Sequence, residues 1–169
     1  MELWDLYTEN LEPTGLTHVR GVPVPDGYYH LVVHAWIRNS EGKYLISRRA
    51  ASRPAYPLYW ECVGGSVIKG EDGLTGALRE TEEEVGLKFA PGDATHLFSR
   101  VRKTINARVF NDILDVWLFI YDGPVSLENA TTDEVCDLKW MTVEEIRALF
   151  DAGELVPTLG YFFTDVAGR

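Results

Sequence analysis

Residues 65–87 constrain the chain more than any other stretch, because glycines and charged residues recur there at fixed spacings. A helix over residues 72–85, turning about 100° per residue, brings Glu80, Glu83 and Glu84 into one sector. An apolar stripe beside this sector is formed by Leu74, Ala77, Leu78, Thr81 and Val85. The stretch therefore predicts a helix that presents an acidic face next to a face for packing.

The acidic face favours a divalent cation. Three carboxylates on one helical face repel one another by a few tenths of a kcal/mol per pair. Mg²⁺ or Mn²⁺ removes that cost, because both ions prefer oxygen ligands. Glu80, Glu83 and Glu84 are therefore the candidate metal ligands, whereas Glu82 points elsewhere and is expected to be solvated. The alternative, typical of a lone acidic run, is a solvated helix face without a ligand.

The spacing of this stretch resembles the Nudix box, Gly-x5-Glu-x7-Arg-Glu-U-x-Glu-Glu-x-Gly-U, in which U is an apolar residue. The matching positions are Gly65, Glu71, Arg79, Glu80, Glu83, Glu84, Gly86 and Leu87. One position departs from the pattern: Thr81 replaces the first apolar residue, and its hydroxyl is expected to bond a backbone carbonyl. The box is the specific part of the resemblance, which extends over roughly residues 28–150.

The resemblance implies a reaction and a role for each matching residue. The reaction is hydrolysis of a nucleoside diphosphate linked to another moiety, with the metal held by Glu80, Glu83 and Glu84. Arg79 matches the orienting arginine and Glu71 its loop partner. The glycine that lets the backbone approach the phosphates falls at Gly65. A metal ion there can neutralise charge and deliver an activated water.

The remaining pattern predicts an α+β domain with a mixed sheet. Strands are expected at residues 30–37, 43–47, 59–63, 95–109, 113–121 and 134–141. The first two strands are expected to form a hairpin, and the two long ones to flank a turn at Asn111 and Asp112. A capping box at Thr142 and Glu145 opens a helix through residue 150, and a last helix is possible at residues 156–163.

The family resemblance implies an α/β/α sandwich with the box as a loop–helix–loop. Residues 1–169 read as a single domain, because no linker interrupts them. Residues 1–27 contain two short apolar arms, at 4–7 and 16–19, separated by turn-forming residues. These arms predict an N-terminal β-ribbon that covers a domain edge or contacts a second copy in a homodimer.

Charge and composition narrow the partners. The net charge of −10 argues against nucleic acid and anionic membranes, so a small diphosphate substrate is expected. No apolar run is long enough to span a membrane, and the first residues do not resemble a secretory signal. A cytoplasmic protein is the resulting expectation. Cys62 and Cys136 lie in apolar contexts, which favours buried, reduced thiols.

Several candidates for chemistry lie outside residues 65–87. Glu134, at the start of an expected strand, is the first choice for the base that activates water, although exposed strand-start carboxylates are common. Arg48 and Arg49 are favoured over Arg53 as phosphate ligands, because guanidinium groups bind phosphate bidentately. Solvated surface charge is the alternative for each arginine.

Two other functions compete with hydrolysis. Residues 30–71 resemble isopentenyl-diphosphate isomerases in the order of a histidine-containing strand, paired arginines, proline, tryptophan and glycine. Alignment through the box, however, places the isomerase's catalytic cysteine at Gly64 and its metal-binding histidine at Ser66, and Cys62 lies two residues early. The second alternative, a non-catalytic nucleotide-binding regulator, is disfavoured because no box carboxylate is missing.

Overall fold

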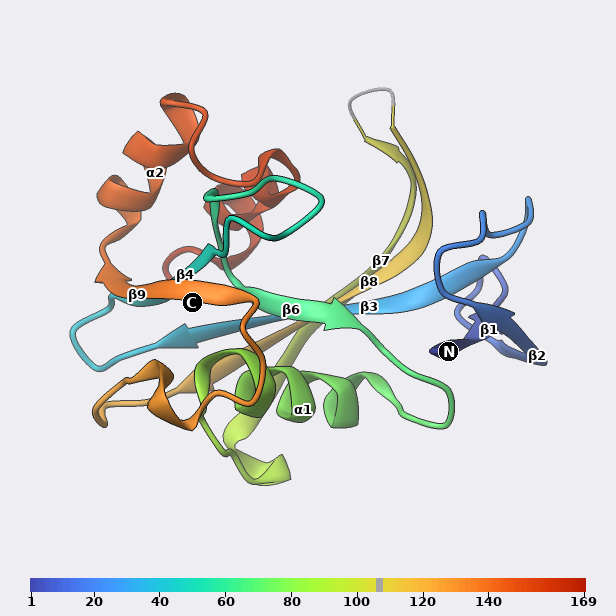
Figure 1. The fold of residues 1–169 in the computed structure, drawn as a ribbon, viewed down its shortest axis with the longest axis horizontal. Helices are drawn as coiled ribbons and strands as arrows, with labels where there is room; N and C mark the ends of the chain where they lie inside the picture. Colours follow the sequence, from blue (N-terminus) through green and yellow to red (C-terminus); the bar gives the residue numbers. More distant parts are fainter. Residues whose placement is uncertain (106–107) are drawn as a thin grey trace.

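The computed structural model describes residues 1–105 and 108–169. In this part of the chain, nine strands form one mixed sheet with α1 (Gly73–Val85) on one face and α2 (Val143–Asp151) on the other (Figure 1). The strands are β1 (Leu3–Tyr7), β2 (Pro13–Val19), β3 (Tyr29–Arg38), β4 (Tyr44–Arg49), β5 (Trp60–Glu61), β6 (Val63–Ser66), β7 (Ala94–Ile105), β8 (Arg108–Ile120) and β9 (Val135–Met141). The expected α+β class with a mixed sheet is confirmed.

Strand β3 is the centre of the sheet. Along one edge it pairs in parallel with β8, from His30↔Asp112 to Arg38↔Ile120. Three strands follow one another along its other edge: β1, then β6, then β4. This arrangement places β6, which carries the start of the glycine- and glutamate-rich stretch, directly beside the middle of β3.

The two faces of β3 bury different cores. Val33, Ala35 and Ile37 pack with α1, whereas Trp36 packs with the C-terminal segment around Phe162. Side chains alternate between the faces of a strand, so residues paired in register across the sheet share a face. Gly65, paired with Val33, therefore belongs to the α1 face, and its two neighbours in β6 belong to the opposite face.

Helix α1 forms as its local sequence predicts. Asp72 caps its start by accepting a hydrogen bond from the Thr75 backbone N–H at 2.8 Å. Gly86 ends it in the left-handed region, at φ 69°. The hydroxyl of buried Thr81 donates to the Leu78 carbonyl at 2.8 Å, so this polar side chain is satisfied inside the core.

Long-range strand pairing differs from two of the expectations. The hairpin predicted between residues 30–37 and 43–47 is confirmed only next to its turn: β3 and β4 pair antiparallel at Arg38↔Tyr44, because β1 and β6 occupy the rest of that edge of β3. The turn predicted at Asn111 and Asp112 is wrong, because both residues lie within β8. Asn111 has φ 49° at a bulge in the β7–β8 ladder, and asparagine tolerates this conformation. Residues 106 and 107 of the predicted 95–109 strand lie outside the described residues.

The predictions for the C-terminal helices and the two cysteines are confirmed in part. The capping box opens α2, with Thr142 and Glu145 bonded reciprocally. The possible helix at residues 156–163 is present as a short 3₁₀ helix, Pro157–Tyr161, followed by a π-helical turn, Phe162–Val166. Cys62 is buried as expected, but Cys136 is exposed. In the part of the chain that the structure describes, no helix has the length and apolar character needed to cross a membrane.

Strands β1 and β2 pair antiparallel and join the sheet through β1 and β3. Trp4 stacks on His30 of β3, with ring centroids 3.9 Å apart. The backbone also reaches the loop that precedes α1: the Lys69 N–H donates to the Leu3 carbonyl at 2.8 Å, and the Gly70 N–H donates to the Asp5 carboxylate at 2.7 Å. The ribbon is thus held against the glycine-rich loop.

Candidate active site

A small polar pocket of about 130 Å³ gathers most of the residues that the sequence singles out. Its lining includes the acidic residues of α1, the glycines of β6 and charged side chains from three other segments. The lining residues are Glu2, Arg20, Arg53, Gly64, Gly65, Ser66, Arg79, Glu80, Glu83, Glu84, Thr132 and Glu134. The predicted ligands Glu80, Glu83 and Glu84 therefore lie in one cavity, together with the predicted base Glu134.

Two contacts between β6 and α1 place the carboxylates. The Gly64 backbone N–H donates to the Glu84 carboxylate at 3.2 Å. Gly65 lies so close to Glu80 that a Cβ added there would come within 2.6 Å of the Glu80 carboxyl carbon. A side chain at this position would have to displace the Glu80 carboxylate, so glycine here allows that carboxylate to lie against β6.

Burial changes the proton affinity of two of these carboxylates. Glu80 and Glu84 are 8% and 4% exposed. Burial raises the pKa of Glu84 well above its ordinary value, and the negative charges of Glu61 and Glu80 add to the effect. Burial also raises the pKa of Glu80, with Arg79 acting in the opposite direction. Buried carboxylates of this kind favour a compensating cation.

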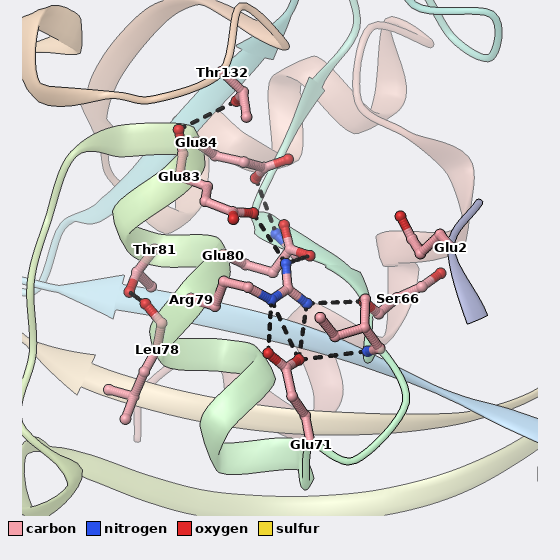
Figure 2. Close-up of polar contacts among 12 residues, drawn as sticks. Glu2, Ser66, Glu71, Leu78, Arg79, Glu80, Thr81, Glu83, Glu84 and Thr132 are labelled. Atoms are coloured by element: carbon pink, nitrogen blue, oxygen red, sulfur yellow. Dashed lines mark hydrogen bonds and ion pairs between the residues drawn. The ribbon is translucent and has the colours of Figure 1, made fainter. Parts of the chain in front are cut away.

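Arg79 supplies part of that compensation (Figure 2). Its Nη1 donates to Glu80 at 2.8 Å and to Glu83 at 3.0 Å, and its Nε donates to Glu71 at 3.0 Å. Its Nη2 donates to the Ser66 carbonyl at 3.0 Å. The predicted Arg79–Glu71 pair is thus present, and it ties the loop, the helix and β6 together.

The donor set fits a hard divalent cation, although the side chains are engaged with Arg79. Glu80, Glu83, Glu84 and Glu134 all present carboxylate oxygens to the pocket, which are the ligands that Mg²⁺ and Mn²⁺ prefer. As the side chains stand, no three acidic, histidine or cysteine groups among the described residues converge to hold an ion. Arg79 bonds Oε1 of Glu80 and Oε2 of Glu83, so the second oxygen of each carboxylate is not engaged by Arg79 and could bind a cation.

The arginines are distributed differently from the expectation. Arg53, not Arg48 or Arg49, lines the pocket, where it pairs with Glu134 at 2.6 Å. Arg49 is held by buried Glu61 at 2.6 Å, and Arg48 donates to the Leu58 carbonyl. Strand β4 directs Arg48 and Arg49 to partners outside the pocket, whereas the following loop returns Arg53 to it.

Sequence reasoning missed three charged residues near the site. Glu2 and Arg20, from opposite arms of the ribbon, line the pocket, and Glu2 extends from the N-terminal strand toward the acidic face of α1 (Figure 2). No local pattern signals them, because their position depends on long-range pairing. Glu61 could have been found, because it is a charged residue inside an otherwise apolar strand, and burial raises its pKa.

A larger cavity of about 710 Å³ lies elsewhere, lined by β7, the ribbon turn and the C-terminal segment. Its lining includes Arg100, Leu114 and Tyr161. Ser66 pairs with Val32, Val32 with Leu114, and Leu114 with Arg100. These four residues form one row on the face opposite α1. Ser66 lines the small pocket and Arg100 lines the large cavity, and three strand-to-strand spacings separate them, a distance of about 14 Å.

Other reactive side chains lie apart from the pocket. Cys62 is 3% exposed, and it does not line the pocket in the part of the chain that the structure describes. Burial raises the pKa of its thiol well above the ordinary value. His34 is bonded through Nδ1 to the Tyr161 hydroxyl at 2.7 Å. Burial lowers the pKa of His34 to about 3. Both residues are therefore structural, and the burial of Cys62 agrees with the expectation for this thiol.

Comparison with known proteins agrees with this fold. The model of the NUDIX domain family matches residues 28–160. An uncharacterised Nudix hydrolase of Listeria monocytogenes is 36% identical over 164 residues, covering 96% of this chain and 91% of that protein. An isopentenyl-diphosphate Delta-isomerase of Escherichia coli O127:H6 is 28% identical over 142 residues, covering 83% and 76%. A crystal structure from Deinococcus radiodurans has a TM-score of 0.76 at 24% identity, covering 99% of this chain and all of that one.

The fold is an α+β domain with a carboxylate-lined pocket, and the comparisons identify its family. The chain belongs to the Nudix hydrolase family and is a pyrophosphohydrolase by class. The predicted Nudix fold is confirmed, with α1 as the helix of the loop–helix–loop. The match to the family model begins after the ribbon, so residues 1–27 are an addition to the part that the model covers.

Proposed function

We propose that this chain hydrolyses the diphosphate linkage of a nucleoside diphosphate-type small molecule in the presence of Mg²⁺ or Mn²⁺. The observation that carries the proposal is the shared pocket of Glu80, Glu83, Glu84 and Glu134. Two of these carboxylates are buried and burial raises their pKa values, so a bound cation would stabilise their ionised forms. A pocket of about 130 Å³ has room for a phosphoryl group but not for a whole nucleotide.

The side chains then have distinct roles. Glu80, Glu83 and Glu84 would hold the metal, which supplies charge neutralisation for the diphosphate and an acidified water. Glu134, which lines the same pocket, is the proposed base that accepts the proton of the attacking water. Arg79 orients Glu80 and Glu83 and limits their mutual repulsion.

The larger moiety of the substrate is proposed to occupy the 710 Å³ cavity. That volume is typical of small-molecule sites, and the separation of about 14 Å is close to the length of a nucleoside with its phosphates. Arg100 and Tyr161 offer a cation and an aromatic ring on its lining. A substrate with a small phosphorylated end and a larger second moiety fits both spaces.

Isomerase chemistry is the alternative that the E. coli relative raises. The pocket contains Gly64 and Ser66 at the two positions where the resemblance places the isomerase's cysteine and histidine. Cys62, the nearest thiol, is buried and its pKa is raised, which opposes formation of a reactive thiolate. These observations favour hydrolysis over isomerisation.

A panel of nucleoside diphosphates, nucleotide sugars and dinucleoside polyphosphates, incubated with Mg²⁺ or Mn²⁺, tests the proposal by product analysis. Hydrolysis of at least one diphosphate linkage, abolished by chelation of the metal, is the expected result. Proton exchange on isopentenyl diphosphate without phosphate release would favour the isomerase instead. Melting shifts with these compounds but no turnover would indicate a non-catalytic regulator.

A further inference from the structure

The N-terminal ribbon contributes a cation to the mouth of the carboxylate pocket. Arg20 follows β2, and Glu2 precedes β1, on the two neighbouring arms. Both side chains line the pocket beside Glu80, Glu83 and Glu84. Neither belongs to the residues matched by the family model, which begin at residue 28.

The position of this cation is fixed by the ribbon's attachments. The Arg20 backbone N–H donates to the Glu2 carbonyl at 3.0 Å, which joins the two arms. The stacking of Trp4 on His30 and the bonds to Lys69 and Gly70 hold the ribbon against the loop that leads into α1. These contacts therefore hold the guanidinium of Arg20 beside the pocket.

Arg20 is also the pocket arginine that is most available to a ligand. Arg79 is bonded to four groups of the protein, and Arg53 is paired with Glu134 with its side chain 22% exposed. The Arg20 side chain is 49% exposed, and both of its bonds to Glu2 use Nη1, at 2.9 and 3.0 Å. In the described residues, its Nε and Nη2 have no hydrogen-bond partner, so one edge of the guanidinium is open.

We infer that Arg20 binds a phosphoryl group of the substrate, with Glu2 holding the guanidinium in place and competing for it in the free protein. This inference rests on the proposed function, because it assigns a substrate contact to the same pocket. Exposed ion pairs are weak, whereas bidentate arginine–phosphate bonds are strong and directional. A substrate phosphoryl group thus displaces Glu2 from Arg20 without unfolding the ribbon.

The test measures binding and turnover in the full chain with Mg²⁺. Inorganic pyrophosphate is the binding probe, followed by calorimetry, and KM and kcat are measured with the diphosphate compound that turns over fastest. Arg20→Ala is expected to weaken pyrophosphate binding and raise KM by about ten-fold or more, with a smaller change in kcat. Arg20→Lys keeps the positive charge but lacks the planar guanidinium, so its pyrophosphate affinity is expected to lie between those of wild type and Arg20→Ala.

Glu2→Gln separates ligand binding from a merely structural ion pair. The amide keeps an acceptor for the Trp4 indole N–H, which bonds Glu2 at 3.2 Å, but removes the competing charge. The inference predicts tighter pyrophosphate binding for Glu2→Gln and weaker binding for Arg20→Ala. A structural role predicts that both variants weaken binding, and that result would overturn the inference even if Arg20→Ala folds poorly.

Lys43→Ala is the matched control, because Lys43 forms an exposed 2.9 Å pair with Glu41 on a turn outside the pocket lining. It is expected to leave pyrophosphate affinity unchanged. Affinity of Arg20→Ala within two-fold of wild type would refute the contact. If wild type hydrolyses no diphosphate compound but binds pyrophosphate through Arg20, the proposed hydrolysis fails while this inference stands.

Discussion

Among the carboxylates of the pocket, Glu84 is the most deeply buried, and it is bonded directly to the backbone of β6. Its carboxylate accepts the Gly64 N–H, and its pKa is raised by burial and by neighbouring carboxylates. The ionised form is therefore costly to the free protein, and this cost is offset when a cation binds. Glu82, two residues earlier on the same helix, instead pairs with Lys88 at the surface.

Glu84→Gln is expected to lower kcat by about a thousand-fold, because loss of a metal ligand removes several kcal/mol of transition-state stabilisation. The melting temperature without metal should stay the same or rise, because the neutral amide removes a buried charge. Steady-state kinetics and thermal unfolding check both expectations. Glu82→Gln is the matched control and should retain wild-type kcat; near-normal turnover in Glu84→Gln would show that the ligand set is wrong.

Arg79→Ala is expected to reduce both turnover and stability. The change leaves Glu71, Glu80 and Glu83 without their shared partner, and we expect a loss of about 2–3 kcal/mol in the free energy of unfolding. For a chain of this length that loss lowers the melting temperature by roughly 5–10 °C. Saturating Mg²⁺ should restore part of it, because a cation replaces the lost charge; an unchanged melting temperature would remove the orienting role from Arg79.

Among the elements, the ribbon and β6 determine the pocket as much as α1 does. Strand β6 brings Gly64 and Gly65 against the helix, and the ribbon completes the opposite wall. The junction between ribbon and sheet depends on the stacked pair of Trp4 and His30, both 8% exposed. The Nδ1 atom of His30 is buried and has no partner among the described groups, which makes its protonation unfavourable.

Acid is expected to weaken the attachment of the ribbon. Burial, with the positive charge of Arg102, lowers the pKa of His30 from 6.5 to about 4. The unfolded chain binds a proton below pH 6.5 that the folded chain does not bind until about pH 4. The stability from neutral His30 is therefore complete above pH 6.5 and is lost as pH falls toward 4.

His30→Phe keeps an aromatic ring against Trp4 and removes the titrating group. Urea unfolding at pH 7.5 and 4.5 should show a smaller loss of stability on acidification than in wild type. The loss should not vanish, because burial also lowers the pKa of His34, to about 3. An equal loss in both proteins would show that His30 does not contribute to the acid sensitivity.

For the whole molecule, the fold and the metal are expected to be separable. The sheet is covered by two apolar cores on its opposite faces, and neither core includes the acidic pocket. Chelation should therefore abolish hydrolysis while the circular dichroism spectrum stays native. Added Mg²⁺ should raise the melting temperature in a concentration-dependent way, because it binds the folded chain preferentially. Unfolding on chelation would instead assign the metal a structural role.

The sequence alone determined the features that depend on near neighbours. Helix α1 and its acidic face follow from spacings of one to eight residues, and so do the Arg79–Glu71 pair and the family. The tertiary structure decided which strands meet. The partners of β3, the entry of Arg53 rather than Arg48 into the pocket, and the contribution of Arg20 all depend on pairing between distant segments. Strand periodicity fixes which face a side chain takes, but it carries no information about which partner lies alongside.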